Sequence, residues 1–507
     1  MSASAYPALV SHFRELSVLQ SCSAVLGWDQ QTYMPRGGGA FRGEQLALLA
    51  KLCHERATDP RIEGWLTTAE VAPDSPEAAN VREWRHGYDR ATKLPARLVE
   101  ELALATSAAH EAWESARKED QFETFRPHLE AILKLKREEA QAIAPSPTTA
   151  LSQGLGERYY DALLDEYEPG TTAADLKTLF AELTAALVPL IRRVADGPPA
   201  DTSCLRREFA PDRQKWFAEG AAEAIGFDFR TGRLDKTAHP FCSAFGPGDC
   251  RLTTRYNPRF FNEAFFGVLH EAGHGIYEQG LPTEAFGTPC GTFCSLGVHE
   301  SQSRLWENQV GRSAEFWQHW FPRLKQAFPG VLSDVTGDTF VKAINAVSPS
   351  LIRVEADEAT YNLHIAIRFD LEVALLGGDL SVSDLPAAWN DSYEKALGVR
   401  PPSDALGCLQ DIHWSFGGFG YFPTYTLGNL LAAQLLAAAR TALPDLSANL
   451  GQGVYAPLLG WLREHIHRHG RQFRANDLCR RATGTALTAG PFLAYLTGKF
   501  GTTGPVS

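Results

Sequence analysis

The most constraining feature of the sequence is a His-Glu-x-x-His pattern inside an apolar segment at residues 265–277. The segment predicts a helix, in which residues four apart lie roughly 40° from each other around the axis. His270 and His274 can therefore direct two imidazoles at one metal ion, while Glu271 lies one step round the helix. The apolar flanks predict a buried helix, and burying three such side chains is costly unless something pairs them. The pattern favours a metal site over two surface histidines.

The predicted metal is zinc, because zinc takes nitrogen ligands readily and leaves a position for water when three protein groups bind it. Cobalt or manganese could occupy the same ligands. Glu271 can reach a water on the metal without being a ligand itself. We therefore predict a zinc hydrolase in which Glu271 accepts the proton of the metal-bound water and passes it to the leaving group.

A catalytic zinc needs a third protein ligand, and the residues that follow His274 limit the choice. One class of zinc peptidases uses a histidine six residues later, but that residue is Gly280 here. Glu278 points along the helix and away from the metal, and Glu284 lies in a loop that contains proline and glycine.

Glu300 is the better third ligand. It follows His274 by 26 positions in a segment of helical spacing, so a second helix can turn back and pack against the first. Glu307 is the alternative ligand. An ordinary ion pair between Glu300 and Arg304, four residues on, would explain the same glutamate without a metal.

The composition is that of a folded globular protein, with 507 residues, 44% hydrophobic and 21% charged. A net charge of −12 disfavours nucleic acid and anionic membranes as partners. No apolar run is long enough to span a bilayer, and the first residues lack the pattern of a signal peptide. The nine cysteines are scattered and odd in number, which predicts free thiols, Cys290 and Cys294 included, in a cytoplasmic protein.

Most of the chain has helical spacing, and we expect one mostly α-helical domain over residues 1–507. Within it we expect a helical N-terminal region at about 1–145, a catalytic core at about 225–430 and a helical C-terminal region at about 431–507. A loop over residues 28–35 should end the first helix.

Residues 227–256 should form a small sheet beside the metal helix. An edge strand leading directly into that helix could hold an extended peptide by main-chain hydrogen bonds. The metal helix itself should end near Gly280, a suitable residue just beyond a helix.

Six motifs in one order resemble those of the carboxypeptidase Taq family of metallocarboxypeptidases, and the resemblance covers nearly the whole chain. They are His239-Pro240-Phe241, Asp249-Cys250-Arg251-Leu252-Thr253, the His270–Gly280 helix, His299-Glu300-Ser301-Gln302-Ser303, Ile352-Arg353-Val354-Glu355-Ala356-Asp357 and Gly407-Cys408-Leu409-Gln410-Asp411-Ile412-His413-Trp414. The resemblance implies a helical zincin fold similar to neurolysin and angiotensin-converting enzyme, with a deep groove. It also implies a homodimer, broad release of C-terminal amino acids except proline, and Glu300 as the third ligand.

The remaining chemistry needs a donor to the oxyanion, which contributes roughly 3 kcal/mol to transition-state stabilisation. His413 and one of Tyr421 and Tyr425 are the candidates, because the glycine-rich loop between them can bring a phenol close to the metal. Either tyrosine could equally be a core ring with a satisfied hydroxyl.

An enzyme that counts from the C-terminus must recognise a carboxylate, and the planar fork of arginine suits that task. Arg353 is the first candidate, although an ion pair with Asp357 would give it a purely structural role. Arg251 is the second candidate. His465, His467 and His469 point to different helical faces, and we interpret them as structural or solvent-facing. An endopeptidase or dipeptidase with the same core, and a silent zinc-binding protein, are the alternatives; Glu271 disfavours the silent protein.

Overall fold

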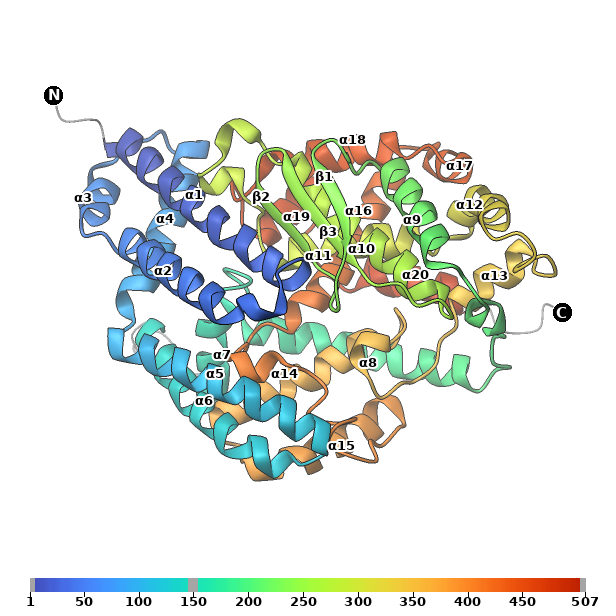
Figure 1. Cartoon of the computed structure of the whole chain (residues 1–507), viewed down its shortest axis with the longest axis horizontal. Coiled ribbons are helices and arrows are strands. Elements are labelled where there is room, and N and C mark those ends of the chain that lie inside the picture. The colour runs from blue at the N-terminus through green and yellow to red at the C-terminus, as the bar shows by residue number, and fades with distance from the viewer. Residues whose placement is uncertain (1–4, 145–153, 502–507) are drawn as a thin grey trace. The chain divides into compact units, whose positions relative to one another are not determined.

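The computed structural model describes residues 5–144 and 154–501. They form a mostly helical structure with one three-stranded sheet (Figure 1), which confirms the predicted fold class. Among these residues, no helix combines the length and apolar character needed to cross a membrane.

The chain divides into two compact units, each assembled from three separate segments. The first unit comprises the described residues of Met1–Ala91, Ala200–Asn345 and Leu431–Leu487, and the second those of Thr92–Pro199, Ala346–Leu430 and Thr488–Ser507. The expected single domain with three consecutive regions stays a prediction, and each unit is described by itself below.

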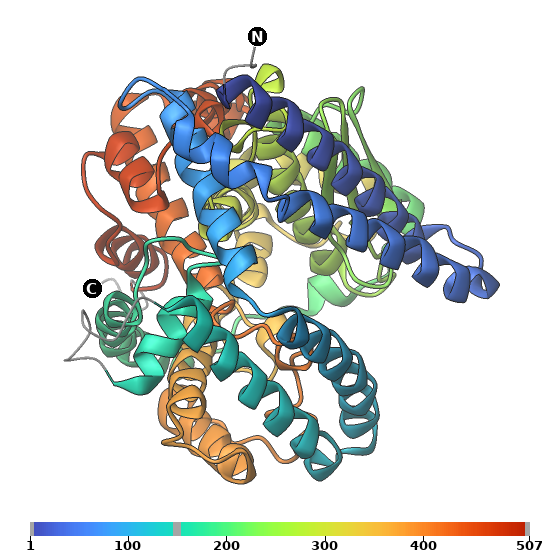
Figure 2. The ribbon, with the colours of Figure 1, turned by 90° about the vertical axis from the view of Figure 1, so that its left-hand side faces the viewer.

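The first unit contains the helix that carries His270 and His274, with further helices before and after it along the chain. In chain order these helices are α1 (Ala5–Thr32), η1 (Arg36–Gly38), α2 (Gly39–Ala57), α3 (Arg61–Thr68), η3 (Ser203–Arg206), α9 (Pro211–Ile225), α10 (Phe261–Gly280), η4 (Thr283–Ala285), η5 (Pro289–Gly291), α11 (Leu296–Arg304), the π-helical turn η6 (Leu305–Val310), α12 (Ala314–Ala327), α13 (Gly337–Ile344), α17 (Leu446–Gln452), α18 (Ala456–His465), η10 (His467–His469) and α19 (Ala475–Thr483). Figures 1 and 2 show α1 and α2 side by side as a hairpin.

The second unit is built from long helices joined by short helical turns. They are α5 (Ala96–Glu119), α6 (Phe122–Ile143), α7 (Leu155–Leu164), α8 (Ala173–Ala195), η7 (Arg353–Glu355), α14 (Tyr361–Gly377), η8 (Val382–Asp384), α15 (Leu385–Leu397), η9 (His413–Phe416) and α20 (Gly490–Phe500). Two further helices, α4 (Pro76–Lys93) and α16 (Pro423–Ala442), contribute residues to both units.

The sheet lies in the first unit and has the strand order β1-β3-β2. β1 (Gly232–Lys236) pairs with β3 (Asp249–Thr254) in parallel, with Leu234 opposite Leu252. β2 (Cys242–Gly246) pairs with β3 antiparallel on the other side. Leu234 and Leu252 are buried, so this face of the sheet packs on the core against α10.

The expected edge strand leading into the metal helix is wrong. The strand that precedes α10 is β3, and it is the central strand of the sheet, while β1 and β2 form the two edges. The misplacement came from β1, whose sequence Gly-Arg-Leu-Asp-Lys has three charged residues and pairs with a strand 18 positions away. A parallel pairing of this kind depends on long-range contacts that local composition does not reveal.

α10 is held by aromatic packing at its start and by close backbone contact near its middle. Phe261 stacks on Phe265 at 5.1 Å between ring centroids, and Trp317 of α12 packs on Phe265 at 5.2 Å. Gly273 lies so close to α11 that an added Cβ would be 2.6 Å from the carbonyl oxygen of Gln302. The helix is thereby buried along most of its length, as its apolar flanks predict.

The C-terminal ends of α1 and α10 differ in detail from the expectation. α1 does not stop at Trp28 but continues to Thr32. Trp28 is buried, with the guanidinium of Arg251 4.3 Å from its ring centroid. Gly280 is the last residue of α10 and not the residue beyond it. Glycine is needed there because a Cβ would come within 2.4 Å of Nδ1 of His467.

Candidate metal site

The two histidines of α10 and the glutamate of α11 converge. The Nε2 atoms of His270 and His274 lie 3.2 Å apart. Oε2 of Glu300 lies 3.7 Å from Nε2 of His270 and 3.4 Å from Nε2 of His274. One ligand atom from each side chain falls within 4.8 Å of the others. Two imidazole nitrogens and one carboxylate oxygen are a donor set that fits zinc and leaves further positions open.

Glu307 and Arg304 support these groups from behind. Oε2 of Glu307 lies 2.9 Å from Nδ1 of His270, on the side of the ring opposite Nε2. Arg304 donates to Oε1 of Glu300 at 2.6 Å and to Glu307 at 3.0 Å. The ion pair between Glu300 and Arg304 therefore exists, but it uses one carboxylate oxygen and leaves Oε2 directed at the histidines. Glu307, the alternative ligand, instead contacts Nδ1 of His270, on the side of the ring away from Nε2.

The charges of the site follow from burial and from Arg304. Burial lowers the pKa of His274 to about 3, so its imidazole is neutral, as a ligand must be. Burial would raise the pKa of Glu307, but the Arg304 guanidinium and a hydrogen bond with His270 outweigh it and bring that pKa to about 2. The same arginine and the two histidines overcome burial and hold the pKa of Glu300 well below its usual range.

Glu271 lies on α10 beside His270 and has a different environment from the other carboxylates. It is buried, and burial raises its pKa to about 7, with the positive potential of His270 opposing that shift and Glu300 adding to it. A carboxyl group with a pKa near the operating pH can both accept and return a proton. This suits the predicted general base.

Arg353 lies in η7 of the second unit and is 5% exposed. Its Nε and one Nη donate to Oδ1 of Asp411 at 3.0 and 2.7 Å, and its other Nη donates to the hydroxyl of Tyr361 at 2.8 Å. The alternative partner Asp357 instead accepts from backbone amides, including those of Ala359 and of a residue nine positions upstream. The acidic partner of Arg353 is therefore Asp411, and not Asp357 as the spacing of four residues suggests.

Asp411 pairs with a second arginine. Oδ2 of Asp411 lies 2.6 Å from Nη2 of Arg368, which is fully buried. Two guanidinium groups share one carboxylate, so the three side chains carry an excess positive charge. Their field brings the pKa of Asp411 far below its usual range despite the opposing effect of burial.

His413 and the two candidate tyrosines lie in the same unit as this charge cluster. Nε2 of His413 lies 3.3 Å from the hydroxyl of Tyr425, and its ring is 5.2 Å from that of Tyr421. Burial lowers the pKa of His413 to about 3, and the neighbouring arginines add to that shift against the effect of Asp411. The Arg353 guanidinium lies 5.0 Å from the ring centroid of Tyr425. The structure therefore brings His413, Tyr421, Tyr425 and Arg353 together.

Arg251 belongs to the first unit, on β3. It donates twice to Asp249, both times at 2.8 Å, and lies between the rings of Trp28 and Phe245. Its charge is therefore already paired. Of the three C-terminal histidines, His467 is buried and 3.0 Å from Oε1 of Gln302, which confirms its structural role.

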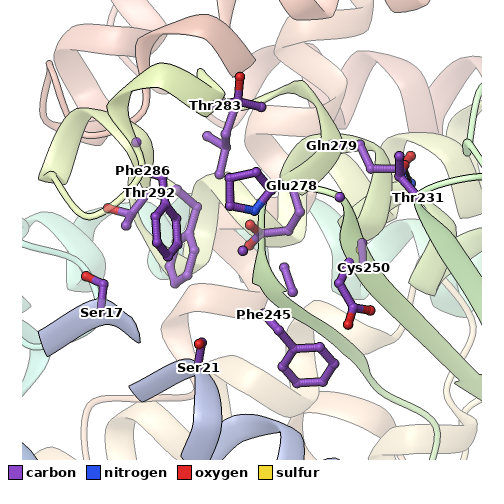
Figure 3. Close-up of a pocket in the computed structure, with 18 of the residues that line it drawn as sticks. Ser17, Ser21, Thr231, Phe245, Cys250, Glu278, Gln279, Thr283, Phe286 and Thr292 are labelled. Carbon is purple, nitrogen blue, oxygen red and sulfur yellow. Dashed lines mark hydrogen bonds between the residues drawn. The ribbon is translucent and has the colours of Figure 1, made fainter. Parts of the chain in front are cut away.

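A cavity of about 450 Å³ opens beside the C-terminal end of α10 in the first unit (Figure 3). α1, the β2–β3 turn, the end of α10 and the segment that follows it form its walls. Aromatic lining comes from Phe245 and Phe286, and Glu278 projects into the space between them.

Sequence reasoning gave no role to two residues that touch the site. His299 directly precedes Glu300, and its Nδ1 lies 2.5 Å from Nδ1 of His274. Glu278, which the sequence excludes as a metal ligand, places Oε1 2.8 Å from Nε2 of His299. The available signals were the position of Glu278 four residues after His274 and of His299 one residue before Glu300. All nine cysteines are free thiols, as predicted.

Residues 8–500 match the model of the carboxypeptidase Taq (M32) metallopeptidase family. The chain is 50% identical over 502 residues to thermostable carboxypeptidase 1 of Thermus thermophilus, covering 98% of each chain. It is 37% identical over 497 residues to carboxypeptidase 1 of Bacillus subtilis, covering 97% of this chain and 96% of the relative. The crystal structure of an M32 carboxypeptidase from Deinococcus radiodurans superimposes with a TM-score of 0.94 at 43% identity, over 98% of this chain and 99% of the other.

Proposed function

Because the chain belongs to the carboxypeptidase Taq (M32) family and is a metallocarboxypeptidase, we propose that it is a zinc enzyme that removes C-terminal amino acids from peptides with broad specificity, proline excepted. The observation that carries the proposal is the convergence of His270, His274 and Glu300 with the buried Glu271 at the adjacent helical position. Cobalt and manganese are the substitutes that the same donor set can accept.

His270, His274 and Glu300 would hold the zinc. When bound, zinc supplies a Lewis acid that polarises the scissile carbonyl and makes a water acidic near neutral pH. The neutral imidazole of His274 and the ionised carboxylate of Glu300 are already in the protonation states that ligation requires. No proton has to leave either group on binding, which supports their assignment as ligands.

Glu271 is the general base in this proposal. Its carboxylate accepts the proton of the attacking water and returns it to the amine of the departing amino acid. The raised pKa of about 7 supports both transfers, because a group that is half ionised near neutral pH can act as base and then as acid.

His413 and one of Tyr421 and Tyr425 are the proposed donors to the oxyanion. A neutral His413, with its pKa at about 3, can donate one N–H without bringing a full charge. Its Nδ1 is buried and has no hydrogen-bond partner among the residues that the structure describes. The hydroxyl of Tyr425 lies 3.3 Å from Nε2 of His413, so a shift of either side chain can direct this hydroxyl at the oxyanion.

Arg353 is the first proposed partner of the substrate carboxylate. The excess positive charge shared by Arg353, Arg368 and Asp411 supports this role, because a second carboxylate would neutralise it. Arg251 is the second proposal, and the carboxylate of Asp249 already pairs with it.

The wider assignments are part of the same proposal. Peptides are the substrates, and neither nucleic acid nor membrane is a partner of a chain with a net charge of −12. The nine free thiols support a cytoplasmic location. A homodimer is proposed from the resemblance to the family.

The deciding experiment is mass spectrometry of a peptide mixture in which each peptide is present as a free acid and as a C-terminal amide. The purified enzyme is compared with the same enzyme after chelation and after addition of zinc. Stepwise loss of C-terminal residues from the free acids alone, abolished by the chelator and restored by zinc, is the expected result. Equal cleavage of the amides would contradict a carboxypeptidase, and activity that survives complete chelation would contradict the metal.

A further inference from the structure

The outer nitrogen of His274 has an unusual neighbour. Because the Nε2 atoms of His270 and His274 converge, their Nδ1 atoms point away from the proposed metal position. Nδ1 of His270 meets a carboxylate, that of Glu307, at 2.9 Å. Nδ1 of His274 instead meets a second imidazole, that of His299, at 2.5 Å.

His299 is fixed in this orientation from several sides. Its Nε2 lies 2.8 Å from Oε1 of Glu278, one helical turn beyond His274 on α10. The ring packs edge-on against Phe293 at 4.8 Å between centroids and lies tilted against Tyr277 at 5.3 Å. The imidazole therefore bridges the ligand and the carboxylate with one nitrogen toward each.

The hydrogen positions follow from the chemistry of a histidine ligand. A neutral imidazole that binds a metal through Nε2 carries its hydrogen on Nδ1. Nδ1 of His274 must therefore donate to Nδ1 of His299. The hydrogen of a neutral His299 is then on Nε2, where it donates to Glu278. This order gives both nitrogens of His299 a suitable partner.

We propose that Glu278 and His299 form a positioning relay that fixes the tautomer and ring orientation of His274 and so strengthens metal binding. This inference rests on the proposed metal site. Ligating histidines commonly donate to a carboxylate, a carbonyl or water, and loss of such partners weakens metal binding about 10- to 100-fold. Here the carboxylate of Glu307 contacts His270 directly. The carboxylate of Glu278 reaches His274 through the intervening ring of His299.

The cavity beside α10 makes Glu278 the better residue to change. Its side chain projects into this space (Figure 3), whereas the His299 ring packs against Phe293 and Tyr277. Glu278→Gln keeps the shape and removes the charge. Glu284→Gln is the matched control, because it makes the same change at an exposed position just after the same helix.

The test measures the zinc dissociation constant of the full chain by competition with a chromophoric chelator. Glu278→Gln and His299→Gln should weaken zinc binding about 10- to 100-fold, while Glu284→Gln should match the unmodified chain. The visible spectrum of the cobalt-loaded protein should change in the first two variants and not in the control. The double variant should bind no more weakly than His299→Gln alone, because both residues act through one chain of contacts.

The outcomes separate the relay from the proposed function. An unmodified chain that binds no zinc stoichiometrically overturns the metal site itself, and the relay with it. A chain that binds one zinc, with equal affinity in Glu278→Gln and Glu284→Gln, overturns the relay and leaves the proposed function standing. Additive losses in the double variant also overturn it. If His299→Gln does not fold, as judged by circular dichroism, Glu278→Gln decides the question.

Discussion

Single side chains in this enzyme gain their chemistry from partners far away in sequence. Glu271 and Glu372 are both buried glutamates with a pKa raised to about 7, yet one lies beside the metal ligands and the other in the second unit. Burial causes both shifts, so a raised pKa by itself does not identify a catalytic group. Position beside a convergent set of ligands does.

Glu271→Gln should separate metal binding from catalysis. The amide cannot accept a proton, so kcat should fall roughly 100- to 10,000-fold. Zinc content should stay at one per chain, because Glu271 is not a proposed ligand. Steady-state assays on a free-acid peptide and elemental analysis of the same preparation measure both. Retained kcat at full zinc occupancy would contradict the role of general base.

Glu372 should make the stability of the protein depend on pH. It accepts hydrogen bonds from the Trp414 indole, the Tyr160 hydroxyl and the amide of Gly420, but burial dominates and raises its pKa from 4.5 to about 7. The folded state then holds this proton more tightly than the unfolded state, so stability falls as pH rises from about 4.5 to about 7 and is constant above that.

The size of this effect is about 3 kcal/mol, from the difference between the two pKa values. Urea unfolding of the unmodified chain and of Glu372→Gln at pH 5 and pH 8 measures it. The unmodified chain should lose more stability between these pH values than the variant does, by roughly 2–3 kcal/mol, because the first part of the loss occurs below pH 5. An equal loss in both proteins would show that Glu372 titrates normally.

At the scale of elements, the site depends on how closely α10 and α11 approach. Gly273 permits that approach, since a Cβ would lie 2.6 Å from two backbone atoms of α11, in Gln302 and Ser303. The π-helical turn η6 then continues α11 and carries Glu307 to the back of His270. Such turns commonly occur at functional sites.

Gly273→Ala and Gly267→Ala form a matched pair in one helix. Gly273→Ala should destabilise the protein by about 1–3 kcal/mol and weaken zinc binding, because α11 and Glu300 must move. At Gly267 the nearest atom to an added Cβ is Oγ1 of Thr254 at 3.9 Å, so alanine should stabilise the helix by up to about 1 kcal/mol. Thermal unfolding and chelator competition measure both. Equal effects in the two variants would contradict this account of the packing.

The local parts of this site could be predicted from the sequence, and the distant contacts could not. His270 and His274 meet because one helix spaces them, and Glu300 follows on the next helix. The partner of Arg353 lies 58 residues away, at Asp411, and no local pattern points to it. The expectation of an edge strand before α10 was wrong for the same reason. The parallel pairing of β1 with β3 joins two segments whose compositions say nothing about each other.

For the whole molecule, the metal should stabilise the first unit selectively. A ligand that binds only the folded state contributes about 2.7 kcal/mol when present at 100 times its dissociation constant. Chelation should therefore lower the thermal unfolding midpoint and speed hydrogen exchange in α10 and α11. Exchange in α14 of the second unit should change less. Calorimetry and hydrogen-exchange mass spectrometry test this, and equal exchange changes in α10 and α14 would contradict it.

The interleaving of the two units has a consequence for synthesis. Each unit needs a segment from beyond residue 430, so neither can close while the ribosome is still making the middle of the chain. His467, which fills the space left by Gly280 and contacts Gln302, emerges long after the metal ligands. The nascent chain therefore exposes the part of α10 and α11 that His467 covers until translation is nearly complete, and surfaces left exposed during folding are the usual targets of chaperones.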